Sequence, residues 1–140
     1  MPTPESAAVA VELRTAMGRL TRRVQHEDRI PHGQVAVLGV LDRDGAMTTS
    51  DLAADQRVRP QSMARAVGLL AEQGLVTRRP HPTDGRKSLV ELSPAGRAAL
   101  ETERGRRAGW LAQAIERELT TQERELLARG ATLMERLAAH

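Results

Sequence analysis

Cysteine is absent from this 140-residue sequence, and so are phenylalanine and tyrosine, while tryptophan occurs once, as Trp110. The lack of cysteine excludes a disulfide framework, a thiolate nucleophile and a cysteine redox sensor. The scarcity of aromatic side chains argues against single-stranded DNA or RNA as a ligand, because these are usually bound by stacking on aromatic rings. Leu, Val, Met and Ala must fill the core, which favours helices packed on helices over a broad sheet.

Long apolar runs are missing as well. No segment approaches the roughly 18 consecutive apolar residues that a transmembrane helix needs. The first residues lack the basic start and the apolar core of a signal peptide. A length of 140 residues suits one domain with a substantial core. We therefore expect a single-domain cytoplasmic protein without a membrane partner.

Motifs of metal binding and catalysis are not found either. Metal-ligand spacing is absent among the four histidines, which are His26, His32, His81 and His140. The sequence contains no glycine-rich phosphate loop and no nucleophile elbow, and no acid is paired with a base in a catalytic pattern. We therefore expect no metal, no cofactor, no catalytic residue and no enzymatic activity.

Positive charge is concentrated in one segment. The whole sequence has a formal net charge of +3, whereas residues 57–87 contain seven Lys and Arg against two Asp and Glu, a net charge of +5. Such a local excess is typical of a surface that meets a polyanion such as nucleic acid. The alternative is a solvated basic face without a partner.

The spacing of apolar residues, prolines and glycines predicts a series of helices and a small hairpin. The expected helices cover residues 6–28, 31–42, 48–57, 60–73 and 94–118, and a last helix begins at the capping box Thr120-x-x-Glu123. The expected strands are residues 75–79 and 88–92.

The helices at 48–57 and 60–73, joined by a tight turn, have the pattern of a helix-turn-helix. One side of the second helix suits the core, with Met63, Val67 and Leu70. Its other side is polar and flat, with Gln61, Ala64, Arg65 and Gly68. A flat face fits a major groove about 12 Å wide, where Arg65 can pair with guanine and Gln61 with adenine. The alternative is an ordinary surface helix with a solvated arginine.

The hairpin carries charge in the turn between its strands, at Asp84-Gly85-Arg86-Lys87. Three helices followed by a basic hairpin have the organisation of a winged helix. Such a turn projects Arg86 away from the body, and a guanidinium enters a narrow minor groove at lower cost than a lysine ammonium does. Asp84 is near enough in sequence to constrain the arginine or the turn. The alternative is a hairpin turn whose charge is incidental.

These residues resemble the wing signature of the multiple-antibiotic-resistance regulator family, the MarR family. The signature matches at Asp84-x-Arg86, Leu92-Ser93 and Gly96, preceded by Gly74-Leu75-Val76 and Arg78. Upstream, the start of the family's helix-turn-helix resembles Met47-Thr48 followed by Asp51-Leu52-Ala53. Ala64 departs from the family pattern, because many relatives carry a hydroxyl residue there for phosphate or base contact.

The resemblance implies a mainly α fold with a small β-hairpin, a winged helix-turn-helix with long N- and C-terminal dimerisation helices. Residues 1–140 would form one MarR-type domain, with a DNA-binding lobe at 31–92 and dimerisation helices at 6–28 and 94–139. The resemblance also implies a homodimer, and a small anionic or aromatic effector bound between the dimer helices and the lobe. The candidate residues for that effector are Met17, His26, His32 and Trp110. For Trp110 the alternative is packing in the core or in the dimer interface.

The terminal helices carry apolar stripes that the lobe does not need for its own core. The stripe of the last helix consists of Leu126, Leu127, Leu133, Met134 and Leu137. A second copy is the economical cover for these stripes. Two-fold symmetry would place two recognition helices about 34 Å apart, on successive major grooves of a palindromic site. The alternative is a monomer whose terminal helices pack only on each other.

We therefore predict a sequence-specific transcriptional regulator, most simply a repressor, that binds a palindromic operator in double-stranded DNA as a homodimer. Residues 60–73 would lie in the major groove and residues 80–87 in the minor groove. The predicted DNA-binding residues are Arg57, Arg59, Pro60, Gln61, Ser62, Arg65, Arg78, Arg79, Asp84, Arg86 and Lys87. Two alternatives remain open, a winged-helix protein-interaction module and an architectural protein that binds DNA independently of sequence.

Overall fold

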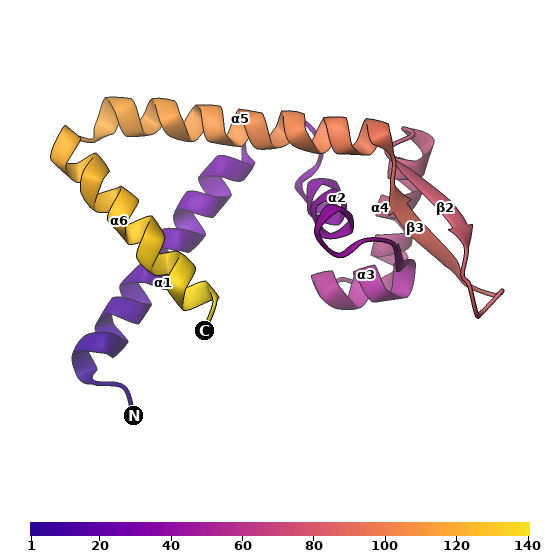
Figure 1. The fold of residues 1–140 in the computed structure, drawn as a ribbon, viewed down its shortest axis with the longest axis horizontal. Helices are drawn as coiled ribbons and strands as arrows, with labels where there is room; N and C mark the ends of the chain where they lie inside the picture. Colours follow the sequence, from indigo (N-terminus) through magenta and orange to yellow (C-terminus); the bar gives the residue numbers. More distant parts are fainter.

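The computed structural model describes residues 1–140, which are arranged around one long helix (Figure 1). The elements are, in order, α1 (Pro4–Gln25), α2 (His32–Asp44), β1 (Met47–Thr48), α3 (Thr49–Gln56), α4 (Pro60–Glu72), β2 (Val76–Pro80), β3 (Ser88–Leu92), α5 (Pro94–Glu118) and α6 (Thr121–Ala138). Helices α2 to α4 and the sheet form a lobe under one end of α5, while α1 and α6 lie toward its other end. The predicted class, a mainly α winged helix-turn-helix with long terminal helices, is confirmed. None of the helices combines the length and apolar character needed to span a membrane.

The sheet has three antiparallel strands in the order β1-β3-β2. Strands β2 and β3 are the predicted hairpin and pair over their full length. Strand β1 was not predicted, because a strand of two residues is too short to show alternation. Its residue Met47 pairs with Val90 of β3. This pairing fixes the start of α3 beside the loop half of β3.

Side-chain caps explain where the later helices begin. The hydroxyl of Ser93 accepts a hydrogen bond from Gly96 N–H (2.9 Å) at the start of α5. Thr120 and Glu123 exchange the two hydrogen bonds of a complete capping box at the start of α6, as the sequence predicts. The starts of α5 and α6 are thereby defined by local side chains.

The first helix is the main correction to the predicted bounds. It begins at Pro4 rather than at residue 6, because the Thr3 hydroxyl accepts a hydrogen bond from Ser6 N–H (3.1 Å) and caps it. It ends at Gln25, and residues 26–31 form an irregular linker into α2 instead of a further helical turn.

The core belongs to the lobe. It contains 13 buried apolar residues, contributed by α2, α3, α4, β2, β3 and the first part of α5. Leu38 and Leu52 are fully buried within it. The predicted inner face of α4 is confirmed, since Met63, Val67 and Leu70 are all buried. The opposite face of α4 is therefore directed away from the core.

Helix α5 approaches the lobe very closely at Gly96. A Cβ atom at this position would lie 1.9 Å from the carbonyl oxygen of Leu75. Ser93 also joins the start of α5 to the segment before β2. Its hydroxyl donates to the carbonyl of Gly74 (2.6 Å), and its N–H donates to the carbonyl of Leu75 (3.1 Å). The absence of a side chain at residue 96 therefore allows the long helix to sit against the start of the hairpin.

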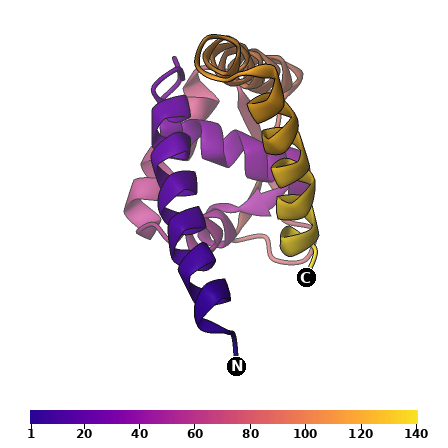
Figure 2. The ribbon, with the colours of Figure 1, turned by 90° about the vertical axis from the view of Figure 1, so that its left-hand side faces the viewer.

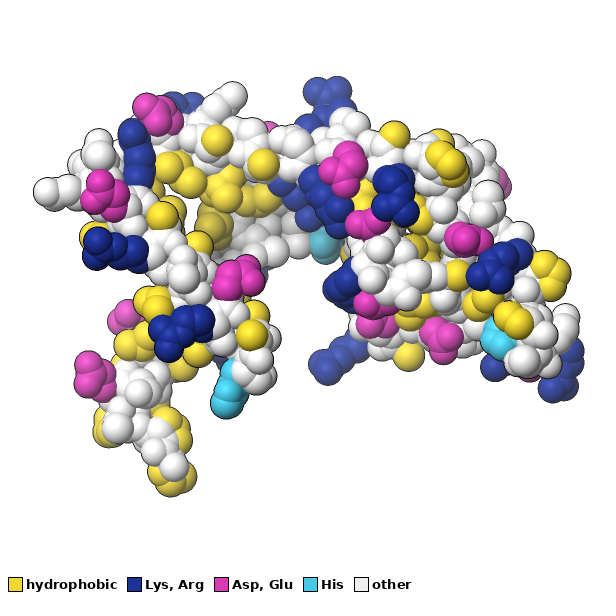
Figure 3. Space-filling view, viewed as in Figure 1, with side chains coloured by type: hydrophobic (Ala, Val, Ile, Leu, Met, Phe, Trp, Pro, Cys, Tyr) yellow, Lys and Arg dark blue, Asp and Glu magenta, His cyan; other side chains and the backbone are white.

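Helices α1 and α6 contain no buried residue in the single chain. They lie on opposite sides of the molecule when it is viewed from its end (Figure 2). Hydrophobic side chains gather beneath α5 and along these two helices (Figure 3). The large apolar side chains exposed on them are Val9, Val11, Met17, Leu20, Leu126, Leu127, Leu133, Met134 and Leu137. The alternative in which the terminal helices cover each other is not the arrangement of this chain.

Candidate nucleic-acid interface

Helix α4 presents a polar face away from the core. It begins at Pro60, which lacks an N–H and suits the first position of a helix, and Arg59 is its N-cap residue. Gln61, Ala64 and Arg65 are exposed on the side opposite the buried stripe. Because Ala64 is small, Gln61 and Arg65 are free to project from a face of low relief. A helix of this shape can enter a major groove.

The turn between α3 and α4 contains a residue in an unusual backbone conformation. Arg57 has φ 53° and ψ 45°, and it is the only residue other than glycine with a positive φ. Its N–H and that of Val58 donate to the α3 carbonyls of Ala54 (3.3 Å) and Ala53 (3.1 Å). A left-handed conformation costs a side-chain-bearing residue about 1–2 kcal/mol. Backbone geometry therefore does not explain why this exposed corner holds an arginine.

The loop between β2 and β3 is shaped by its own side chains. Nδ1 of His81 accepts hydrogen bonds from the N–H groups of Thr83 (3.2 Å) and Asp84 (3.1 Å). Asp84 accepts a hydrogen bond from Arg86 N–H (3.1 Å), and its carboxylate lies 3.5 Å from the Arg86 Nε. The Arg86 side chain is nevertheless 93% exposed. Asp84 thus constrains the turn while the arginine extends into solvent.

A polar hollow lies between the hairpin and the start of α3. Its volume is about 320 Å³, and its lining contains no hydrophobic residue. The lining residues are Thr48, Thr49, Ser50, Arg78, Arg86, Lys87 and Ser88. Three cationic side chains beside hydroxyl groups and a helix N-terminus suit an anionic group such as phosphate.

Four residues of this hollow are absent from the predicted site, namely Thr48, Thr49, Ser50 and Ser88. Thr49 and Ser50 are the first residues of α3, and the pairing of β1 with β3 brings them beside the hairpin formed by β2 and β3. The sequence signal that could have found them is the strand-forming pair Met47-Thr48, whose second residue is also the N-cap of α3. That signal is too short to stand out before the register of the sheet is known.

Most of the predicted DNA-binding cations have no acidic partner within the chain. Those that form no ion pair are Arg57, Arg59, Arg65, Arg78 and Lys87. Arg79 differs, because its Nε lies 2.9 Å from the Glu91 carboxylate across the hairpin. The positive charge of Arg79 is therefore partly neutralised, whereas that of its neighbours is available to a ligand.

The four residues named for an effector do not share one site. Trp110 is half-buried, and the guanidinium carbon of Arg23 lies 4.2 Å from the centre of its ring. Trp110 lines a surface pocket of about 320 Å³ whose other residues are Glu27, Arg29, Arg106, Gly109 and Gln113. Met17, His26 and His32 are not part of this lining. His26 is the C-cap residue that follows α1, and His32 is the first residue of α2.

The helix-turn-helix, the three-stranded wing and the unpaired cations together define a winged-helix protein of the DNA-binding class. The model of the MarR family matches residues 30–87. A relative in Mycobacterium bovis, an uncharacterized HTH-type transcriptional regulator, is 38% identical over 131 residues that cover 91% of each chain. This chain belongs to the MarR family of transcriptional regulators.

Solved structures share this fold over almost the whole chain. A putative transcriptional regulator of Pseudomonas aeruginosa is 36% identical and aligns with a TM-score of 0.80, covering 99% of both chains. Wild-type MarR of E. coli in its apo form is 23% identical and aligns with a TM-score of 0.70, covering 98% of this chain and 97% of that one. The likeness to E. coli MarR carries the fold alone.

Proposed function

We propose that this chain is a homodimeric transcriptional repressor that binds a palindromic operator in double-stranded DNA. Residues 31–92 act as the DNA-binding lobe, and α1, α5 and α6 act as dimerisation helices. Helix α4 lies in the major groove, and the loop at residues 80–87 lies in the adjacent minor groove. A dimer across a promoter blocks it without a further partner, which is why repression is the simplest outcome.

The observation that carries this proposal is the set of unpaired cations on the lobe, together with Arg86, whose side chain is 93% exposed. Phosphate contacts supply affinity that falls steeply with salt, and they come from Arg57, Arg59, Arg78, Arg79 and Lys87. The base contacts that select a sequence come from the first turns of α4, at Gln61, Ser62 and Arg65. Arg86 enters the minor groove, held in position by Asp84.

The exposed apolar stripes of α1 and α6 support a homodimer. Helices of 22 and 18 residues with no buried side chain gain little stability from their own hydrogen bonds and need a packing surface. A second copy offers the same stripe in return, which is the self-complementary contact of a two-fold dimer.

The proposal is tested by selecting bound fragments from the source genome and titrating them by fluorescence anisotropy at several salt concentrations. We expect a palindromic consensus and an affinity that falls as salt rises. Arg86→Ala is expected to weaken binding about tenfold, since one good groove contact is worth about 1–3 kcal/mol. Because the side chain is exposed, the fold and the dimer should be unchanged. Affinity equal to that of the wild type would reject the wing assignment.

Two other functions give different results in the same assay. An architectural protein would bind all duplexes with nearly equal affinity. A protein-interaction module would show no salt-sensitive duplex binding at any fragment. Arg86→Lys serves as the graded control, because it keeps the charge but is more strongly hydrated than arginine.

An effector enters this proposal in its simplest form, a small anionic or aromatic molecule beside Trp110. Arg29 and Arg106 line the same pocket and suit an anion, while the indole suits an aromatic ring. Since Trp110 is the only tryptophan of the chain, its fluorescence reports such binding directly.

A further inference from the structure

The linker between α1 and α2, residues 26–31, is hydrogen-bonded to the middle of α5. The Asp28 side chain in this linker is 2% exposed, and both of its oxygens accept hydrogen bonds from Arg107 of α5. The distances are 2.7 Å from Nε to Oδ1 and 2.6 Å from Nη2 to Oδ2. The hydrogen bond to Asp28 is the main cause that raises the pKa of Arg107 above its usual value. A bidentate pair fixes direction as well as distance.

A second buried carboxylate of α5 holds the same linker. The Glu103 side chain is 2% exposed, one of its oxygens accepts from the backbone N–H of Arg29 (3.0 Å), and the other accepts from Arg106. The linker thus forms hydrogen bonds to α5 through the side chain of residue 28 and through the backbone of residue 29. We use the name linker junction for Asp28, Arg29, Glu103, Arg106 and Arg107.

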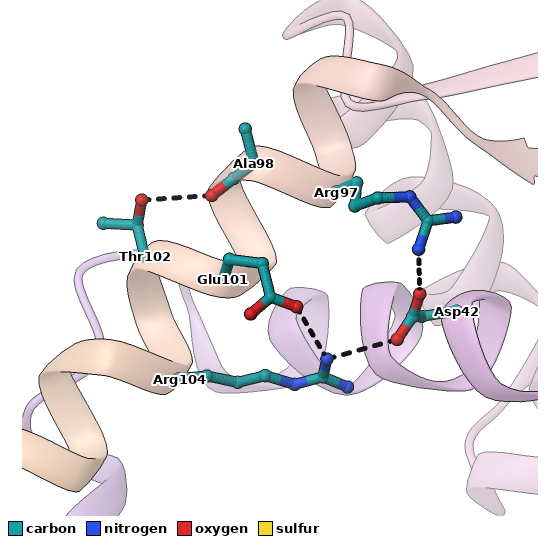
Figure 4. Close-up of polar contacts among 6 residues, drawn as sticks. All are labelled: Asp42, Arg97, Ala98, Glu101, Thr102 and Arg104. Carbon is teal, nitrogen blue, oxygen red and sulfur yellow. Dashed lines mark hydrogen bonds and ion pairs between the residues drawn. The ribbon is translucent and has the colours of Figure 1, made fainter.

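The other end of α2 is tied to α5 by an exposed cluster (Figure 4). Asp42 accepts hydrogen bonds from Arg97 and from Arg104 (3.2 Å), and Arg104 also donates to Glu101 (3.0 Å). These bonds, that of Arg104 first, lower the pKa of Asp42 below its usual value. Exposed ion pairs contribute little, whereas removing one partner of a buried pair leaves a desolvated charge. The linker junction is therefore the more rigid of the two ties.

We propose that Asp28 and Glu103 are positioning residues that set the angle between the lobe and α5. The chain enters the lobe through residues 26–31 and leaves it through α5, so a rotation of the lobe about α5 must break the linker junction. This inference rests on the proposed homodimer, in which that angle determines the distance between the two α4 helices. Asp28 and Glu103 thus specify the spacing of the two half-sites without touching DNA.

The test compares the wild type with Asp28→Asn, Glu103→Gln and the control Asp42→Asn. Each is titrated with palindromic duplexes in which the spacing of the selected half-sites changes in steps of one base pair. The wild type and the control are expected to share one sharp preference. The two junction variants are expected to bind the preferred duplex about tenfold more weakly and to discriminate less, because a lobe that samples several angles is competent for only part of the time.

Loss of folded protein does not mimic this result, since it lowers the affinity for every spacing by the same factor. If both junction variants keep the wild-type preference, the inference is wrong and the proposed function stands. If the wild type itself shows no preference among spacings, the proposed dimer on a palindrome fails, and the inference fails with it.

A distance measurement covers the case in which a junction variant does not fold. The chain has no cysteine, so Ala54→Cys on the exposed side of α3 gives one spin-label site per copy. Arg107→Lys keeps the charge but cannot donate the paired hydrogen bonds, and it serves as a milder junction variant. The label-to-label distances are expected to broaden with Arg107→Lys and to stay narrow with Asp42→Asn. Equal distributions in both would overturn the inference.

Discussion

Arg57 and Arg86 are both exposed arginines, yet the chain positions them differently. Arg86 extends from a loop that Asp84 and His81 shape through hydrogen bonds to its backbone. Arg57 itself occupies the left-handed backbone conformation of the turn between α3 and α4, which glycine adopts without strain. At this corner the guanidinium and the backbone have opposite preferences, so a substitution can separate them.

Arg57→Gly is expected to raise the free energy of unfolding by about 1 kcal/mol, because it removes the strain of a left-handed arginine. The same change is expected to weaken duplex binding and to flatten its salt dependence, since one phosphate contact is lost in each copy. Urea unfolding measures the first effect, and titrations over a range of salt measure the second. A variant less stable than the wild type would show that the arginine side chain stabilises the turn.

The sequence predicts contacts between residues that lie close together along the chain, but not between residues that lie far apart. The influence of Asp84 on Arg86 follows from a spacing of two residues. Asp28 and Arg107 are 79 positions apart. In the sequence, each is one of several neighbouring charged residues, and nothing marks the two as partners. No local pattern joins them, because their contact exists only once α5 has crossed the linker. The predicted site is therefore better defined in the wing than around α5.

At the level of elements, Gly96 and the cap residue Ser93 determine how closely the start of α5 approaches the lobe. The family signature already singled out Gly96, and the structure supplies the physical reason, which is the carbonyl of Leu75. The helices and the hairpin were predicted because each carries a complete local signal, such as the capping box of α6. Strand β1 has no such signal and exists only through its pairing with β3.

Gly96→Ala is expected to destabilise the protein by about 3 kcal/mol, because the new methyl group meets a backbone carbonyl that cannot move aside. Gly105→Ala is the matched control in the same helix, where a Cβ meets nothing within 4 Å. The control is expected to gain about 0.5–1 kcal/mol from helix propensity. Urea unfolding of both variants gives the comparison. Equal stabilities would mean that α5 does not sit against Leu75 in solution.

At the scale of the whole molecule, the core and the exposed apolar surface are separated. The buried residues lie in the lobe and the first part of α5, whereas α1 and α6 bury nothing. The sequence predicts the stripe on α6 from its near-heptad spacing, but spacing cannot show which surface covers a stripe. One candidate cover is removed, because neither α1 nor α6 buries a residue in the single chain, so the two terminal helices do not cover each other.

Leu126→Glu combined with Leu137→Glu is expected to convert the proposed dimer into a monomer, since both leucines are 65% exposed in the single chain. An unpaired charge in an interface costs several kcal/mol, so the dissociation constant of the dimer should rise about a hundredfold or more. Sedimentation velocity over a range of protein concentrations measures the change.

Ala128→Glu combined with Thr132→Glu is the control, because it adds the same charge on the opposite face of α6 and should leave the dimer intact. Because the lobe has its own core, the monomer should still show cooperative unfolding of the lobe. Its affinity for the operator should fall. A stripe variant that stays dimeric would place the interface elsewhere, and α4 of the two copies would then no longer face successive grooves.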